Sequence, residues 1–235
     1  MLRTLAIAAA LSLLPAGHAL ARGQLQARPT LVELQPGNQA GRLVLANTGD
    51  APVAAQVRVY AWSQAGGEDR LADTDTIAIS PAIVKIPAGG EQVVRVVRLG
   101  EAPQGADETY RLVVDELPSP DTASDTAIEL RLRYLVPLFV RAAGAAEPEL
   151  SCHLAGTELD CRNDGGQPAR LGATRMLDDN GRAIVLTEGL FGYLLPGSGR
   201  AWQLETDGLA GLGDGLQLET QVNGQAASLP VPRQP

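Results

Sequence analysis

The sequence predicts an all-β protein, and three observations favour this class. Short runs rich in Val, Ile and Leu alternate with turn sequences such as QPGNQAG, PAGGE and DDNG, a pattern typical of strands joined by tight turns. The spacing of apolar residues has no helical period beyond the N-terminal segment. Aromatic residues make up only 3% of the chain, so small aliphatic side chains must fill the core.

Eight runs stand out as predicted strands, because aliphatic residues of high β propensity dominate them. In chain order they are LVLANTG (43–49), AAQVRVYAW (54–62), EQVVRVVRL (91–99), ETYRLVVDEL (108–117), IELRLRYLVPLFV (128–140), ARLGATRML (169–177), RAWQLET (200–206) and LQLETQV (216–222).

An internal repeat predicts two domains of similar build. The segments LVLANTGDAPVAAQVRV (43–59) and LDCRNDGGQPARLGATR (159–175) both carry Asn-x-Gly-x-x-Pro before an alternating run. The matching residues lie a constant 116 positions apart, which suits two immunoglobulin-like sandwiches of about 100 residues each. A chance similarity of turn chemistry is the alternative. The small-residue stretch 142–147 then forms a linker between domains at 22–141 and 148–235.

The N-terminal segment 1–21, MLRTLAIAAALSLLPAGHALA, has the build of a secretory signal peptide. Arg3 supplies the early positive charge, a short apolar run follows, and the final Ala-Leu-Ala matches a cleavage site. A membrane anchor is the alternative, but the apolar run is too short to cross a bilayer. We therefore expect cleavage after Ala21 and an exported, soluble mature chain without membrane insertion.

The charge balance predicts a poor binder of nucleic acids and of anionic membrane surfaces, so neither is an expected partner. The chain has 19 basic and 27 acidic residues and a net charge of −8, and loss of Arg3 with the signal peptide makes the mature chain more acidic still. It also lacks a basic tract, whereas nucleic-acid binding needs clustered positive charge.

The two cysteines, Cys152 and Cys161, are expected to form a disulfide, because an exported chain folds in an oxidising compartment. If Gly156 and Thr157 form a two-residue hairpin turn, the flanking strands bring the two cysteines face to face. Glycine at the first loop position suits a type II′ turn. A zinc or redox site has little support, since the chain has no CxxC motif.

The chain has few residues from which to build a catalytic or metal site. After removal of residues 1–21 it retains one histidine, His153, and one methionine, Met176. Neither a phosphate-binding loop nor a dinucleotide-binding glycine motif is present. A hydrolase built on His153 or on a pair of carboxylates is the remaining alternative. We therefore expect a binding protein and not an enzyme, with no metal and no cofactor.

The run IELRLRYLVPLFVR (128–141) changes character halfway. Its first part alternates apolar and charged residues, whereas residues 135–140 are apolar on both faces and are expected inside the first sandwich or at the domain junction. The alternating part could lie at a sheet edge, as a template for a strand from another chain, or it could bury one face in its own sandwich. Pro137 cannot donate a ladder hydrogen bond and predicts a bulge, a kink or an edge position.

Four stretches, in the same order, resemble the periplasmic pilus-assembly chaperones of the chaperone–usher pathway. They are ISPAIVKIPAGGEQVVRV (79–96), ETYRLVVDELP (108–118), IELRLRYLVPLFVR (128–141) and YLLPGSGRAW (193–202). The VPLFV pattern, the YRLVVDE stretch and the late disulfide look most like the archaic branch of that pathway. The resemblance implies two immunoglobulin-like β-sandwich domains set at an angle.

In this family the last strand of the first domain completes the unfinished sandwich of a pilin. The resemblance therefore implies donor positions at Ile128, Leu130, Leu132 and Tyr134. It further implies an ATP-independent periplasmic chaperone whose partners are pilin subunits and an outer-membrane usher. Without a client, a second copy of the chain could cap the same edge in a dimer. A secreted two-domain adhesin or structural module without chaperone activity is the alternative function.

The family's anchor for its client transfers only in part. The best-known family members bind the C-terminal carboxylate of the pilin with two basic residues in the inter-domain cleft, but this sequence has Leu31 and Pro137 at those positions. Arg111 and Arg133 are the candidate replacements, because a guanidinium can hold a carboxylate through two hydrogen bonds.

The resemblance also implies an ion pair at the domain junction. The arginine that ends the long strand corresponds to Arg141, and its acidic partner to Asp107 or Glu108, since the correspondence is ambiguous by one residue. Such a pair would orient the two domains, and removing one partner would leave an uncompensated charge.

Overall fold

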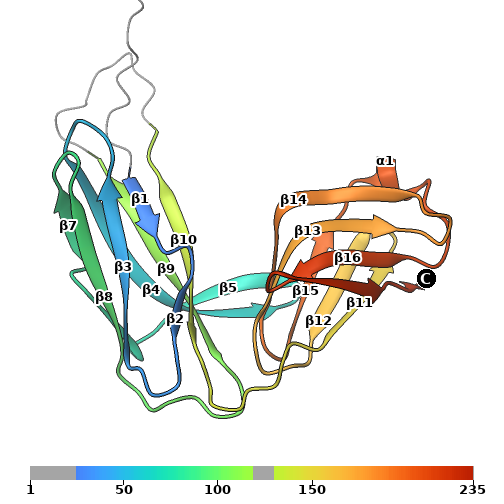
Figure 1. Ribbon diagram of the computed structural model, residues 1–235, viewed down its shortest axis with the longest axis horizontal. Coiled ribbons are helices and arrows are strands. Elements are labelled where there is room, and N and C mark those ends of the chain that lie inside the picture. The colour runs from blue at the N-terminus through green and yellow to red at the C-terminus, as the bar shows by residue number, and fades with distance from the viewer. Residues whose placement is uncertain (1–24, 119–129, 235) are drawn as a thin grey trace, which may run out of the picture.

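The computed structural model describes residues 25–118 and 130–234, so the predicted signal peptide and Ile128 lie outside the described residues. Figure 1 shows two lobes that meet at an angle. Each lobe contains two β-sheets, which confirms the predicted all-β fold of two sandwiches. The exact domain boundaries remain predictions. Within the described residues, no helix is long and apolar enough to cross a membrane.

The first sandwich consists of two sheets. One has the order β1–β3–β8–β6, built from Leu25–Arg28, Ala40–Asn47, Glu91–Arg98 and Ile77–Ser80. The other has the order β2–β10–β9–β4–β5, built from Val32–Leu34, Arg133–Val140, Glu108–Leu117, Val53–Ala65 and Glu68–Asp73, with β7 (Ile83–Ile86) paired to β4. All these pairs are antiparallel except that of β2 with β10.

Aliphatic side chains fill the core between these two sheets, as the low aromatic content predicts. Alternate residues of a strand point to opposite faces of its sheet, and in β10 the buried core residues are Val136, Leu138 and Val140. Tyr134 packs against the same core while remaining partly exposed. The even-numbered residues of β10 thus face the sandwich, and the odd-numbered ones face away from it.

The second sandwich has two sheets of four strands each. One has the order β15–β12–β11–β18, built from Ser198–Gln203, Glu158–Asn163, Leu150–Ala155 and Arg233–Gln234. The other has the order β14–β13–β16–β17, built from Ala183–Leu194, Ala169–Leu177, Gln217–Val222 and Gln225–Pro230. A four-residue helix, α1 (Thr206–Leu209), follows β15.

The sequence did not predict β14, although it is the longest strand of the second sandwich. Its sequence AIVLTEGLFGYL contains two glycines and does not alternate regularly. Its pairing with β13 shifts register on both sides of Gly172 and again after Thr174, and Ala173 between them has a positive φ of 48°. These shifts also leave β14 with irregularly spaced partner residues, which interrupts the period of two on which sequence-based recognition of a strand depends.

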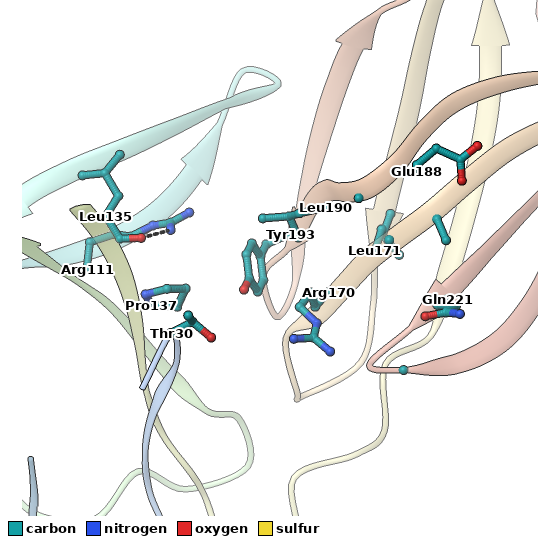
Figure 2. Close-up of a pocket in the computed structure, with 14 residues that line it drawn as sticks. Thr30, Arg111, Leu135, Pro137, Arg170, Leu171, Glu188, Leu190, Tyr193 and Gln221 are labelled. Atoms are coloured by element: carbon teal, nitrogen blue, oxygen red, sulfur yellow. Dashed lines mark hydrogen bonds between the residues drawn. The ribbon is translucent and has the colours of Figure 1, made fainter. Parts of the chain in front are cut away.

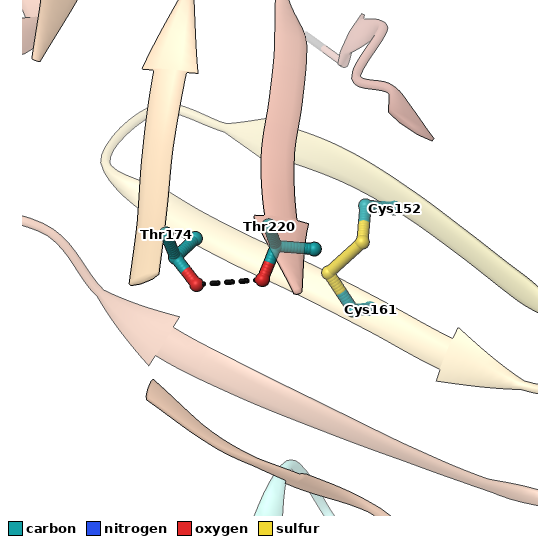
Figure 3. Close-up of a disulfide and its surroundings, with 4 residues drawn as sticks. All are labelled: Cys152, Cys161, Thr174 and Thr220. Atoms are coloured by element: carbon teal, nitrogen blue, oxygen red, sulfur yellow. Dashed lines mark hydrogen bonds between the residues drawn. A yellow bond between two sulfur atoms is a disulfide. The ribbon is translucent and has the colours of Figure 1, made fainter. Parts of the chain in front are cut away.

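The predicted disulfide joins β11 to β12 (Figure 3). These strands pair in the predicted register, with Cys152 opposite Cys161. Gly156 has a φ of 60°, as the first loop position of a type II′ turn requires. The disulfide belongs to the core of the second sandwich. On β13 and β16, the buried hydroxyls of Thr174 and Thr220 lie 2.8 Å apart.

The two copies of the internal repeat build the same turn, each around a buried asparagine. The Asn163 amide donates to the carbonyls of Gln167 at 2.8 Å and Leu194 at 3.2 Å, and its Oδ1 accepts from the N–H of Gly165 at 2.9 Å. Asn47 makes the equivalent three contacts, to Ala51 (2.7 Å), Ile86 (3.2 Å) and Gly49 (3.0 Å). The similarity of the two sequences therefore reflects a shared structure and is not limited to turn composition.

The predicted linker packs against the repeat turn of the second sandwich. The N–H of Gly166 donates to the carbonyl of Ala146 at 3.1 Å, and the Gln167 amide donates to Ala145 at 2.9 Å. The N–H of Asp107, from the first sandwich, donates to the carbonyl of Gly166 at 2.8 Å. This turn thus contacts both the linker and the first domain, and it joins the two lobes at their base.

Candidate functional site

The long strand is shorter than the sequence predicts. A strand was expected over 128–141, but β10 begins at Arg133, and residues 130–132 are not in a strand. Continued beyond Arg133, the register with β9 would place residues 132, 131 and 130 opposite Glu116, Leu117 and Pro118. β9 ends at Leu117, and Pro118 has no N–H with which to extend the ladder. The ladder therefore cannot extend as far as Leu130, and β10 starts close to the end of its neighbour.

Two of the predicted donor residues are exposed apolar side chains. Leu130 is 84% exposed and Leu132 is 42% exposed, so neither belongs to the core of its own sandwich. Leu132 is held through its backbone, since its carbonyl accepts from the N–H of Glu116 at 2.9 Å and its N–H donates to the Glu116 carboxylate at 3.2 Å. Tyr134 differs, because its ring packs on the first core and its hydroxyl donates to the carbonyl of Leu25.

One edge of β10 is open over the first part of the strand. The N–H of Arg141 donates to the carbonyl of Leu34 at 2.9 Å, which places the odd-numbered N–H groups of β10 on the β2 side. β2 pairs only with residues 138–140, and no other described strand covers residues 133–137 on that side. Pro137 lies here, and the pairing with β9 continues past it. An edge position, and not a bulge, therefore accommodates this proline.

This open edge leads into a cleft between the two sandwiches (Figure 2). The cleft has a volume of about 410 Å³. Its walls come from both domains and include Thr30, Arg111, Leu135 and Pro137 of the first, and Arg170, Glu188, Leu190 and Tyr193 of the second. Across the described chain, no group of three or more His, Cys, Asp or Glu side chains could hold a metal ion.

Arg111 is the candidate anchor that lies in the cleft. Its side chain is only 13% exposed, and its Cζ lies 3.5 Å from the ring centroid of Trp62. Its Nη1 donates to the carbonyl of Leu135 at 3.3 Å, while the nearest carboxylate, that of Asp69, lies 4.0 Å from Nη2. Burial lowers the pKa of Arg111, and Asp69 opposes that shift only in part. A buried guanidinium that remains charged favours a further anion beside it.

Arg133, the other candidate anchor, does not line the cleft. It is the first residue of β10, its side chain is 63% exposed, and it forms an ion pair with Asp115. Arg58 pairs with the same carboxylate at 2.5 Å. Burial alone would raise the pKa of Asp115, but hydrogen bonds from Arg133 and Arg58 outweigh it and hold that pKa below its usual value. The structure thus separates the two candidates.

The domain junction contains the ion pair that the resemblance implies. Nη1 of Arg141 donates to the Asp107 carboxylate at 2.6 Å, and the Asp107 side chain is only 1% exposed. Glu33 also pairs with Arg141. Burial would lower the pKa of Arg141, but hydrogen bonds to Asp107 and Glu33 raise it. Glu108 instead accepts a hydrogen bond from Tyr110, so Asp107 is the residue against Arg141.

An aromatic cluster fills the space between the sandwiches. The chain has two Trp, four Tyr and two Phe, and one residue of each type, Trp62, Tyr193 and Phe139, belongs to this cluster. Trp62 lies 6.2 Å from Phe139 and 5.4 Å from Tyr193, measured between ring centroids. Leu31, at one of the family's usual anchor positions, packs against this cluster. Phe139 is an odd-numbered residue of β10, and its place in this cluster explains why that face is apolar there. Leu135 does not follow the prediction for residues 135–140, because its side chain is exposed where one edge of the strand is open.

The hairpin formed by β4 and β5 reaches from the first sandwich to the second (Figure 1). The Gln64 side chain is buried and acts as a bridge: its amide donates to the carbonyl of Tyr193 at 2.8 Å, and its Oε1 accepts from the N–H of Leu195 at 2.9 Å. At the hairpin tip, the N–H of Ala201 donates to the carbonyl of Gly67 at 3.1 Å. The hairpin thus forms a second connection between the domains, in addition to the linker.

Asp69 completes this bridge. It accepts a hydrogen bond from the Gln64 amide at 2.9 Å and pairs with Arg200 of the second sandwich at 2.6 Å. Because these two partners engage Asp69 closely, its carboxylate is a weak partner for Arg111.

We expect Gln64→Leu to lower the free energy of unfolding by roughly 2 kcal/mol, because it leaves the carbonyl of Tyr193 and the N–H of Leu195 buried and unpaired. Chemical denaturation measures the change. Gln92→Leu is the matched control, since the Gln92 amide donates only to an exposed carbonyl on the surface of β8. A loss for Gln64→Leu no larger than that of the control would contradict the bridging role.

Sequence reasoning missed two residues of this region, Gln64 and Arg170. Each occupies a polar position of an extended segment, where a solvated side chain is the ordinary expectation. Only the contact between the two sandwiches distinguishes them, and no local pattern encodes that contact.

Comparison with known proteins identifies relatives of the chain. Residues 24–146 match the family model described as pili and flagellar-assembly chaperone, PapD N-terminal domain. No curated protein sequence matches the chain.

Solved structures share the fold across both sandwiches. One is a chain in the crystal structure of the CsuC-CsuE chaperone–tip adhesion subunit pre-assembly complex, from archaic chaperone-usher Csu pili of Acinetobacter baumannii. It is 24% identical with a TM-score of 0.71, over 90% of this chain and 100% of that one. A chain of the Salmonella enterica SafA pilin–SafB chaperone complex is 15% identical with a TM-score of 0.63, over 88% and 95%. The E. coli chaperone DraB is 18% identical with a TM-score of 0.59, over 88% and 98%. These similarities confirm the two-domain immunoglobulin-like fold.

Proposed function

Because the chain belongs to the family of pilus and flagellar-assembly chaperones, which are non-enzymatic assembly helpers, we propose that it caps pilin subunits in the periplasm by donor-strand complementation. The client would be a pilin that lacks one strand of its sandwich. The chain would supply that strand until an outer-membrane usher exchanges it for a strand of the next subunit. Similarity to a structure from an archaic chaperone-usher system supports placement in that branch.

The open edge of β10 is the observation that carries this proposal. Residues 133–137 offer backbone groups without a described partner strand on one side. Immediately before them, Leu130 and Leu132 are exposed apolar side chains. An edge of this kind favours the addition of a strand from another chain. Ile128, the remaining apolar donor position, lies outside the described residues.

The energetics of such a complex need no nucleotide. Burial of apolar surface contributes about 25 cal/mol per Å², so two or three leucine-sized side chains contribute several kcal/mol before the cost of ordering is subtracted. The client gains the backbone hydrogen bonds that its missing strand leaves unmade. In the absence of a client, a second copy of this chain is the partner expected to cover the same edge.

Arg111, and not Arg133, is the anchor that we propose for the client's C-terminal carboxylate. Arg111 lies in the cleft that the open edge enters, whereas Arg133 is paired with Asp115 at the start of β10. The lowered pKa of Arg111, caused by burial, supports this choice because an added carboxylate would compensate the buried charge.

Co-purification from the periplasm tests the proposed function. Tagged chain is expressed with the small secreted proteins encoded beside its gene, as wild type and as the Leu130→Arg/Leu132→Arg variant. We expect a pilin-sized partner to co-purify with wild type and its yield to fall about tenfold or more in the variant, because two charged side chains replace the apolar donors. Since both leucines are exposed, the variant should remain folded, which circular dichroism checks.

Ile83→Arg/Leu99→Arg is the matched control, because Ile83 and Leu99 are exposed apolar residues of the same sandwich, 61% and 64% accessible, and lie on other elements. It should retain the partner. If wild type captures no partner, the proposed function fails and a two-domain adhesin or structural module becomes the better account.

A further inference from the structure

We propose that the second sandwich supplies half of the site for the end of the client chain. In this inference, which rests on the function proposed above, Arg170 acts together with Arg111 on the client's terminal carboxylate. Leu190 acts together with Leu135 on an apolar side chain next to that carboxylate. Clients that end in an apolar residue are then favoured, and neither sandwich alone would hold that end.

The extent of the open edge determines where a strand of the client, the guest strand, must end. β10 is open over residues 133–137, whereas β2 occupies the same edge from Leu138 onward. A strand added to the open part cannot continue beyond Pro137 without displacing β2. Leu135 and Pro137 both line the cleft, so the chain end of the guest lies in the cleft.

The charge of the cleft selects which chain end it accepts. The whole chain has a net charge of −8, yet Arg111 and Arg170 line opposite walls of the cleft (Figure 2). Within the described residues, the Arg170 guanidinium forms no hydrogen bond or ion pair. Glu188 also lines the cleft, but within the described chain it forms no ion pair with either arginine. Arg111 has its nearest carboxylate 4.0 Å away and Arg170 forms no ion pair within the described residues, so together they favour a carboxylate over an ammonium group.

The apolar walls of the cleft also come from both sandwiches. Leu135 is 52% exposed and Leu190 is 59% exposed, and both line the cleft. A single exposed leucine is ordinary, but here one from each domain lines the same cleft as the two arginines. Val185, on the same strand as Leu190, is equally exposed at 60% and does not line the cleft. The combination of arginines and leucines fits a carboxylate with an apolar side chain beside it.

The backbone at Arg170 is held in place before any client arrives. The N–H of Arg170 donates to Oδ1 of Asn223 at 2.9 Å, and its carbonyl accepts from the N–H of Asn223 at 2.9 Å. The Asn223 amide also donates to the carbonyl of Pro168 at 3.2 Å. A fixed backbone reduces the entropy that is lost when the side chain engages a ligand.

The first test uses the pilin that co-purifies with wild type. It measures the rate at which this pilin dissociates from chains that carry a substitution in the second sandwich. We expect Arg170→Gln to raise the dissociation rate about tenfold or more, because a charge-assisted hydrogen bond is lost. Arg175→Gln is the matched control, since Arg175 lies on the same strand but pairs with Glu219 outside the cleft. Leu190→Ser should accelerate dissociation relative to Val185→Ser. Dissociation rates equal to those of the controls would overturn the inference and leave the proposed function intact.

A second test uses a defined probe and does not require a pilin. The peptide acetyl-Thr-Val-Thr-Val-Thr-Leu is titrated into the full chain as the free acid and as the C-terminal amide, with binding followed by NMR. We expect wild type to bind the acid about tenfold or more tightly than the amide, and Arg170→Gln to bring that ratio close to one. Acid and amide that bind wild type equally, or that both fail to bind, contradict the inference. Failure of wild type to capture a pilin counts against the proposed function alone.

Discussion

Asp107→Ala is expected to lower the free energy of unfolding by about 3 kcal/mol or more. The Asp107 carboxylate is nearly inaccessible and accepts hydrogen bonds from Arg141 at 2.6 Å and from the buried N–H of Ala142 at 2.8 Å. Without it, the Ala142 N–H stays buried and unpaired, and Arg141 retains only Glu33 to balance its charge. Loss of one partner of a buried pair typically costs about 3–5 kcal/mol. Because Glu33 still pairs with Arg141, we expect a loss near the lower end of that range.

Chemical denaturation measures this loss, and an exposed pair provides the control. Asp164 pairs with Arg162 at 2.6 Å, but both side chains are about half exposed, at 52% and 54%. Asp164→Ala should therefore change stability by roughly 0–1 kcal/mol. Equal effects of Asp107→Ala and Asp164→Ala would show that the junction pair contributes no more than a surface ion pair.

Gly165→Ala is expected to be similarly destabilising, by about 3 kcal/mol, through a steric conflict at the linker. A Cβ at Gly165 would lie 2.1 Å from the carbonyl oxygen of Glu147 and 2.8 Å from both the N of Glu149 and the Cα of Pro148. These atoms all belong to the backbone, so no side-chain rotation can relieve the contact. Movement of this segment would also disturb the hydrogen bond from Glu149 to Asn163, which measures 3.1 Å.

Gly100→Ala provides the comparison for this substitution, because a Cβ at Gly100 would meet nothing within 4 Å. Thermal and chemical unfolding of both variants should show a near-neutral change for Gly100→Ala and a large loss for Gly165→Ala. A Gly165→Ala protein as stable as the control would mean that the linker can move aside without penalty.

The fold was largely predictable because its signals are local. Alternating runs mark most strands of the central sheets, and Asn-x-Gly-x-x-Pro builds the same asparagine-centred turn in both sandwiches. The disulfide hairpin was also predictable, since a two-residue turn fixes which residues face each other. β14 escaped prediction because its two glycines and the register shifts in its pairing with β13 break the alternation.

The candidate site was predictable only in part, because a register and an edge depend on neighbours. The sequence indicated a donor strand over 128–141, but β10 starts only at Arg133, close to the end of β9 at Leu117. The sequence offered Arg111 and Arg133 as equal anchors, and only the packing of the two domains puts the first into the cleft and leaves the second beside Asp115.

By itself, the sequence determined that this is an all-β chain of two sandwiches, with a disulfide hairpin and one strand of mixed character. Each of these features follows from side-chain alternation, turn residues or short loops, which act within a few positions of the chain. Tertiary structure alone decided that β10 has an open edge, that Asp107 and not Glu108 meets Arg141, and that Arg170 shares a cleft with Arg111. Those arrangements join residues far apart in the chain, and the energy of packing two sandwiches together fixes them where no local propensity can.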